Sequence, residues 1–169
     1  MKRGLKSITL FICTFILVGS LEATTILAEG IVTLNNFDLV DGGKHLDWDG
    51  GSNYKEVFKV AVQVYNEYKS GVVRPDRWNT LEDVTIGDYY TVNAVNAYTS
   101  SKGYIRFNQY NMDQQTDAQN RQTALKVLGY ALGLGATSNK IDVMYKYTST
   151  ASSLSGNDKA SYDAAYKEY

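Results

Sequence analysis

The chain has 169 residues, with 17 basic and 18 acidic side chains, one histidine, one cysteine and a formal net charge of −1. This length suits one domain with a substantial core, and a single cysteine excludes an intramolecular disulfide. The basic residues are scattered along the chain, which argues against a nucleic-acid partner because phosphate binding needs a concentrated basic face.

The N-terminus has the pattern of a secretory signal peptide. Lys2, Arg3 and Lys6 precede an apolar run over residues 8–19, which is shorter than the ~20 residues of a membrane span. An uncleaved anchor is the competing interpretation, and the short run disfavours it. We place cleavage after Ala28, so residues 1–28 are the signal peptide and residues 29–169 are a single secreted, extracellular domain. No membrane association is expected after cleavage.

Residues 29–49 are predicted to be an extended segment with one strand over residues 45–48, where His45, Asp47 and Asp49 alternate with apolar residues. Acidic residues gather near the glycines of this segment: Asp38, Asp41, Asp47 and Asp49. Their spacing departs from the calcium-loop pattern, so polar turns are the favoured interpretation and a calcium site is the alternative.

A helix is predicted to follow, with Ser52 as its cap and Gly71 just beyond its end. Apolar residues recur there at steps of three and four, which predicts one buried stripe. The stripe consists of Tyr54, Val57, Phe58, Ala61, Val64, Tyr65 and Tyr68.

Residues 72–111 change to a pattern of strands and turns. An extended segment precedes Pro75, and residues 83–87 alternate as a strand. Residues 94–99 and 104–108 flank a Ser-Ser-Lys-Gly turn, which is typical of a hairpin. On the second hairpin strand, Tyr104 and Arg106 share one face, opposite Ile105 and Phe107.

Two further helices begin at capping boxes, Thr116 with Gln119 and Ser155 with Asp158. The first of them is predicted to end at Gly133. The order of helix, strands, helix, turn and helix indicates an α+β fold, with a twisted mixed sheet packed against three helices.

Residues 123–136 read T-A-L-K-V-L-G-Y-A-L-G-L-G-A, and residues 142–145 read D-V-M-Y. This pair of segments resembles the active-site helix and Met-turn of the matrixin-like metzincin metallopeptidases of secreted bacterial type. In that family the helix carries H-E-x-x-H-x-x-G-x-x-H, with three histidines on zinc and the glutamate as general base. The resemblance covers residues 48–169, implies the small metzincin catalytic-domain fold, and makes Met144 the Met-turn methionine, a core residue beneath the cleft.

Aligning Gly133 with the motif glycine places Lys126, Tyr130 and Ala136 at the zinc-ligand positions and Val127 at the glutamate position. Lysine is cationic near pH 7, alanine has no donor atom, and valine cannot accept a proton. The family's zinc ligands and catalytic base are therefore absent.

The histidine count supports the same conclusion. His45 is the one histidine of the sequence and lies far upstream of the aligned helix. A matrixin-type zinc site needs three imidazoles, so one subunit cannot build it. Zinc is the cofactor that the family implies, but no cofactor is expected for this chain.

These features predict a non-catalytic pseudo-peptidase that binds a polypeptide partner through its vestigial cleft. The candidate binding residues are Lys126, Tyr130, Tyr145 and Tyr104, where the Lys126 ammonium either replaces the metal charge or points to solvent. One alternative is an active zinc-dependent endopeptidase with an atypical site. Another is a cell-wall or glycan-binding module, because the chain has 14 tyrosines.

Overall fold

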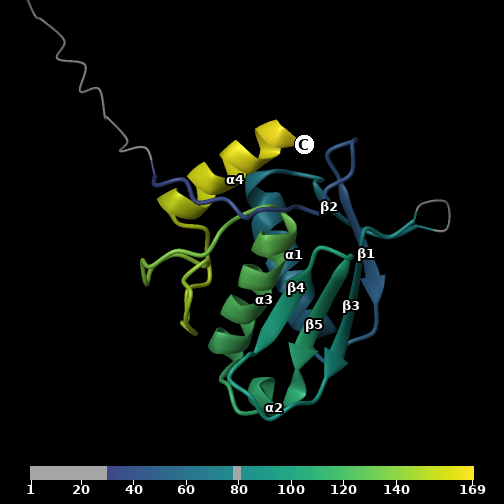
Figure 1. Cartoon of the computed structure of the whole chain (residues 1–169), viewed down its shortest axis with the longest axis vertical. Helices are drawn as coiled ribbons and strands as arrows, with labels where there is room; N and C mark the ends of the chain where they lie inside the picture. The colour runs from purple at the N-terminus through teal and green to yellow at the C-terminus, as the bar shows by residue number, and fades with distance from the viewer. Residues whose placement is uncertain (1–29, 78–80) are drawn as a thin grey trace, which may run out of the picture.

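The computed structural model describes residues 30–77 and 81–169 (Figure 1). The predicted signal peptide lies outside this part of the chain. No helix among the described residues is long and apolar enough to cross a membrane. The elements in chain order are β1 (Leu46–Gly50), α1 (Lys55–Tyr68), β2 (Val73–Pro75), β3 (Val84–Tyr89), β4 (Ala97–Ser100), β5 (Tyr104–Asn108), α2 (Gln109–Met112), α3 (Asp117–Ala131) and α4 (Gly156–Glu168).

The strands form one mixed sheet with the order β2-β1-β3-β5-β4. All neighbouring pairs are parallel except β4 and β5, which form the predicted hairpin at one edge (Figure 1). The α+β class is therefore confirmed. The prediction of three helices misses α2, because four residues are too few to show a helical period.

The core lies between the sheet and the helices. Phe58 of α1 packs edge-on against Trp48 of β1, with ring centroids 4.9 Å apart, and against Phe107 of β5 at 6.4 Å. Tyr65, further along α1, donates a hydrogen bond to the carbonyl oxygen of Leu125 in α3 at 3.1 Å. Its ring also meets Tyr162 of α4 at 5.5 Å. Buried aromatic rings thus join all three long helices to one core.

The predicted cap of α1 is wrong. Its predicted stripe is confirmed in part: Tyr54, Phe58, Ala61 and Tyr65 are buried, Val57 and Val64 are half-buried, and Tyr68 is exposed. The helix begins at Lys55, and no side chain caps it. Ser52 instead donates to the carboxylate of Asp88 on β3 at 2.5 Å and accepts from the amide of Tyr54 at 3.0 Å. Ser52 therefore orders the connection between β1 and α1, because a carboxylate on the neighbouring strand lies within reach of its hydroxyl.

The strand predicted before α1 is present as β1, but the predicted alternation is wrong at Asp47. This side chain is only 4% exposed, like its apolar neighbours Leu46 and Trp48. Arg74 stands opposite Asp47 in the register of β1 and β2, and its guanidinium donates to both carboxylate oxygens at 2.8 Å. A paired charge can be buried where an isolated one would be expelled.

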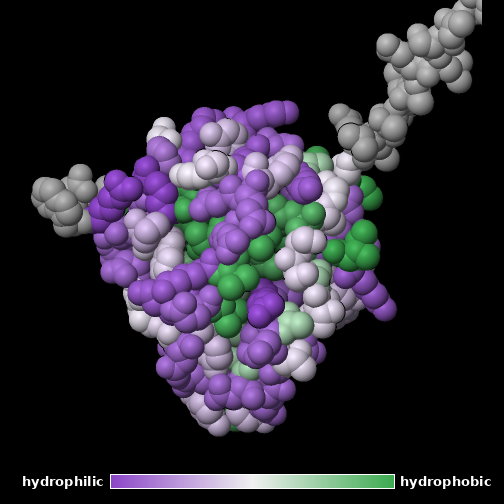
Figure 2. All heavy atoms as spheres, turned by 180° about the vertical axis from the view of Figure 1, so that it is seen from behind, coloured by the Kyte–Doolittle hydropathy of each residue, from purple (hydrophilic) through white to green (hydrophobic). Residues whose placement is uncertain are grey.

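Both predicted capping boxes are present, at Thr116 with Gln119 and at Ser155 with Asp158. The hairpin turn is also confirmed, since the amide of Gly103 donates to the carbonyl oxygen of Ser100 at 3.1 Å. The face opposite that of Figure 1 carries a central band of apolar surface between hydrophilic margins (Figure 2).

Candidate functional site

A cleft of about 290 Å³ lies between the edge strand, α3 and the chain that follows Met144. Residues 94–97 form one wall, α3 forms the second with Thr123, Lys126 and Tyr130, and residues 146–148 form the third. The cleft therefore joins three segments that are well separated in the sequence.

The burial of α3 selects which of its side chains reach this cleft. From Gln122 to Gly135 every residue is buried except Lys126 and Tyr130, which are half-buried. These two residues are four positions apart and so lie on one face, one turn from each other. Lys126 and Tyr130 are also two of the positions that align with zinc ligands of the metzincin motif. The motif resemblance therefore predicts that this face of α3 forms the site.

The ammonium of Lys126 does not extend freely into solvent. It donates to the carbonyl oxygen of Tyr145 at 3.3 Å and to that of Lys146 at 3.5 Å. Burial lowers the pKa of Lys126 from its ordinary value of 10.5, because removing water disfavours the charged form. Burial raises the pKa of the neighbouring Tyr130 phenol for the same reason.

The structure does not bring the other two aligned positions into the cleft. Val127 is 1% exposed and belongs to the hydrophobic core. Ala136 is exposed and lines a different cavity, with Thr33 and Asn139. The chain reaches that cavity through Gly133, whose φ of +81° lets the backbone turn away from the helix axis.

Met144 is buried, as expected for a core methionine, with 1% of its surface exposed. Its sulfur lies 3.8 Å from the hydroxyl of Tyr65. The backbone amides of Val143 and Met144 donate to the buried carboxylate of Asp158 at 2.9 and 3.3 Å. The turn that carries Met144 is therefore held by the N-terminus of α4.

Polar side chains that the sequence did not single out hold the walls of the cleft together. The hydroxyl of Thr99 on β4 donates to the carbonyl oxygen of Val127 on α3 at 2.6 Å, and the amide of Asn96 donates to Thr148 at 2.8 Å. Gln122, fully buried, donates to the carbonyl oxygen of Val143 at 2.8 Å. In the sequence, the one sign of this role is that Gln122 lies one helical turn before Lys126.

The edge strand presents backbone groups to the outside of the sheet. The amide of Asn108 donates to the carbonyl oxygen of Asn96, which makes these two residues a hydrogen-bonded pair of the antiparallel ladder. Because such pairs alternate, the backbone groups of Ala97 and Thr99 point away from β5. Ala97 also lines the cleft.

The remaining predicted binding residues are divided between two faces. Tyr145 supplies a carbonyl oxygen to Lys126, and its ring packs edge-on against Tyr147 at 5.5 Å, which lines the cleft. Tyr104 does not line the cleft. It shares the outer face of β5 with Arg106, whose guanidinium lies 5.1 Å from the Tyr104 ring, while Ile105 and Phe107 are buried.

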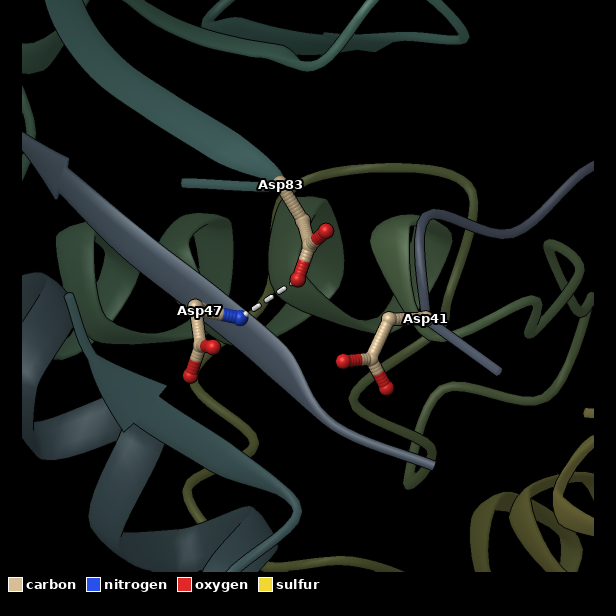
Figure 3. Close-up of side chains that lie close together, drawn as sticks. All are labelled: Asp41, Asp47 and Asp83. Atoms are coloured by element: carbon tan, nitrogen blue, oxygen red, sulfur yellow. Dashed lines mark hydrogen bonds between the residues drawn. The ribbon is translucent and has the colours of Figure 1, made fainter. Parts of the chain in front are cut away.

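Three carboxylates meet beside β1 and the start of β3, away from the edge strand β4 that borders the cleft (Figure 3). Oxygens of Asp41, Asp47 and Asp83 lie within 4.8 Å of one another, close enough to share a cation. Burial, together with the charges of Asp41 and Asp47, raises the pKa of Asp83. Arg74 pairs with Asp47, so a protein group compensates one of the three carboxylates.

This arrangement differs from the four aspartates grouped in the sequence. It includes Asp41 and Asp47, adds Asp83, and leaves out Asp38 and Asp49. His45 lies beside it, with Nδ1 3.8 Å from a carboxylate oxygen of Asp41, and does not line the cleft.

No family model matches the chain, and no curated protein matches it. Among solved structures it is similar to myroilysin, a metallopeptidase, with 12% identity and a TM-score of 0.45. The match covers 72% of this chain and 91% of the other. At this level the likeness is one of coarse fold alone.

Proposed function

We propose that this chain is a secreted, non-catalytic pseudo-peptidase of the matrixin-like type that binds an extended polypeptide in the cleft between β4 and α3. The observation that supports the proposal most directly is that only two side chains in the C-terminal half of α3 are partly exposed. Lys126 and Tyr130, aligned with two zinc ligands, are the two residues between 122 and 135 that escape full burial, and both line the cleft.

The side chains at the aligned positions of α3 are unsuited to zinc-dependent peptide hydrolysis. An ammonium repels a metal cation, and a buried valine in place of the glutamate cannot act as a general base. The sequence has one histidine, which lies beside Asp41 rather than at the cleft. Without three imidazoles, the family's reaction has neither its Lewis acid nor its activated water.

Polypeptide binding does not depend on those groups. The outward backbone groups of Ala97 and Thr99 can pair with an extended segment by strand addition, and the adjoining cleft can take alternate side chains of that segment. The hydrogen bond from Thr99 to α3 fixes the distance between strand and helix, so the site is formed before a ligand arrives.

Metal analysis and a cleavage assay test the absence of catalysis. We expect purified protein to contain far less than one zinc per chain and to leave casein and peptide libraries uncleaved, with or without chelator. Stoichiometric zinc together with chelator-sensitive cleavage would overturn the proposal and favour an active endopeptidase with an atypical site.

A backbone substitution tests the mode of binding. Ala97→Pro removes an amide that faces the outer edge, where proline is tolerated in a sheet, so the fold should persist while peptide affinity falls about tenfold. Ser101→Pro, at the second position of the turn beyond β4, where proline is favoured, is the matched control and should leave affinity unchanged. Equal peptide affinity of the Ala97→Pro and wild-type proteins would exclude strand addition at this edge.

The outer face of the sheet favours a second candidate function, glycan or cell-wall binding. Tyr98 and Tyr104 are 44% and 43% exposed, and Tyr89 packs against Tyr98 with ring centroids 5.5 Å apart. A pull-down on purified cell wall that is lost in a Tyr98→Ala/Tyr104→Ala protein, but kept in Ala97→Pro, would favour this candidate.

A further inference from the structure

The cleft carries positive charge and no negative charge. Lys126 and Lys146 both line it, and every other described residue that lines it is uncharged. Three other described lysines, Lys55, Lys59 and Lys69, each lie within 4 Å of a carboxylate oxygen. None of the described residues that line the cleft is acidic, so its charges are of one sign.

Lys126 has hydrogen-bonding capacity left over. An ammonium has three donors, and two backbone carbonyl oxygens receive bonds from this one. Among the described residues Lys126 makes no ion pair. A half-buried ammonium in this state has lost water without gaining a counter-charge, and an anion in the cleft would supply one.

Lys146 is the second lysine that lines the same cavity. Its backbone carbonyl accepts from Lys126, and its own side chain is exposed, with Nζ 5.2 Å from the centroid of the Tyr147 ring. An anion in the cavity would be attracted by both lysines, and no acidic residue among the described ones that line it would oppose this.

We propose that the cleft recognises a carboxylate group of its peptide ligand, bound between the ammonium groups of Lys126 and Lys146. The inference rests on the proposed function, since it names the chemistry that selects the polypeptide. A carboxylate has two oxygens and accepts from both ammonium groups at once. Tyr130 and Thr123 line the same cavity, and the hydroxyl of Thr123 donates to the side chain of Gln115 at 3.3 Å.

Peptide carboxylates have two sources, an Asp or Glu side chain and a free C-terminus. Both fit a cavity beside an edge strand, because strand addition fixes the backbone and leaves one end or one side chain to enter the cleft. A nucleic acid fits less well, since its row of phosphates needs an extended basic face and the cleft offers two lysines.

Two matched libraries of fluorescein-labelled seven-residue peptides test the proposal on the purified protein. The libraries have the same sequences and differ only in a free or an amidated C-terminus. Binding is measured by fluorescence anisotropy, and each ligand found is resynthesised with Glu replaced by Gln and Asp by Asn. We expect the best ligands to lose about tenfold in affinity either on amidation or on one such side-chain replacement. The change that weakens binding shows whether the carboxylate is the C-terminus or a side chain.

Substitutions assign the carboxylate to these lysines. Lys126→Met and Lys146→Met should each weaken the best ligand about tenfold and reduce the dependence of its affinity on salt. Lys146 is exposed, so its substitution leaves the fold intact even if Lys126→Met does not fold. Lys102→Met, an exposed lysine in the hairpin turn, is the control and should bind as the wild type does.

The outcomes separate this inference from the proposed function. If peptides bind but amidation, side-chain neutralisation and both lysine substitutions leave their affinity unchanged, carboxylate recognition is wrong and polypeptide binding stands. If no peptide of either library binds, polypeptide binding itself fails, and the inference fails with it.

Discussion

Lys126 places a charge at a half-buried position of α3. The surrounding residues of α3 are buried, and the ammonium contacts two carbonyl oxygens instead of a carboxylate. Burying a charge without a partner of opposite charge costs free energy. A residue that opposes stability at a cleft is typical of a site kept for binding rather than for packing.

The pH dependence of stability tests this view of Lys126. Burial lowers its folded-state pKa below the unfolded value of about 10.5. The unfolded state therefore binds more protons between those two values, and stability attributable to Lys126 rises with pH across that window. Lys126→Met should be most stable relative to the wild type at pH 7, and this advantage should shrink toward pH 10.5. Urea denaturation of both proteins at pH 7, 9 and 10.5 measures it, and a constant difference would contradict it.

At the scale of elements, α3 packs closely against α1 and the turn that carries Met144, and this contact determines one of its residues. Gly129 lies in the middle of the helix, where glycine costs about 1 kcal/mol relative to alanine. The reason is contact, because a Cβ at this position would overlap the sulfur of Met144 and the hydroxyl of Tyr65. Glycine thus lets α3 lie directly against α1 and against the turn that carries Met144.

Gly129→Ala should consequently destabilise the protein despite its better helix propensity. Overpacking of a filled core costs about 1–3 kcal/mol. The free energy of unfolding from urea denaturation is the measurement. Gly42→Ala, where a Cβ meets nothing within 4 Å, is the control and should be close to neutral. A more stable Gly129→Ala protein would show that the helix and the turn are not in this contact.

At the scale of the whole molecule, the first turn of α4 supports the cleft from a distance. The buried carboxylate of Asp158 completes the capping box of α4 and also receives the amides of Val143 and Met144. Asp142, also fully buried, accepts from the hydroxyl of Ser155 at 2.8 Å. The chain that follows this turn provides the two carbonyl oxygens for Lys126, so the C-terminal helix positions one wall of the site.

Asp158→Ala should therefore lower the free energy of unfolding by more than the loss of a helix cap does. Removing Thr116, which caps α3 alone, should cost about 1 kcal/mol. Asp158→Ala leaves several buried amides without an acceptor and should cost about 3 kcal/mol or more. Chemical denaturation of Asp158→Ala and Thr116→Ala compares the two. Equal losses would mean that Asp158 acts as a cap only.

Signals that act over three or four residues were sufficient to predict much of the fold. The two capping boxes, the apolar stripe of α1 and the turn before Tyr104 were predicted because each depends on neighbours along the chain. The departures are long-range. Ser52 bonds to Asp88 rather than capping α1, and Asp47 is buried because Arg74 stands opposite it on the next strand.

The sequence by itself determined the α+β class, the position of α3 and the absence of a three-histidine site, since these follow from local pattern and composition. Only the tertiary structure decided which aligned residues share the cleft. It brings Lys126 and Tyr130 to the edge strand, buries Val127 and sends Ala136 to another cavity. The physical reason is that α3 is covered on nearly all sides by α1, β4 and the turn at Met144. Packing around a buried helix, rather than its own periodicity, selects the face that stays open.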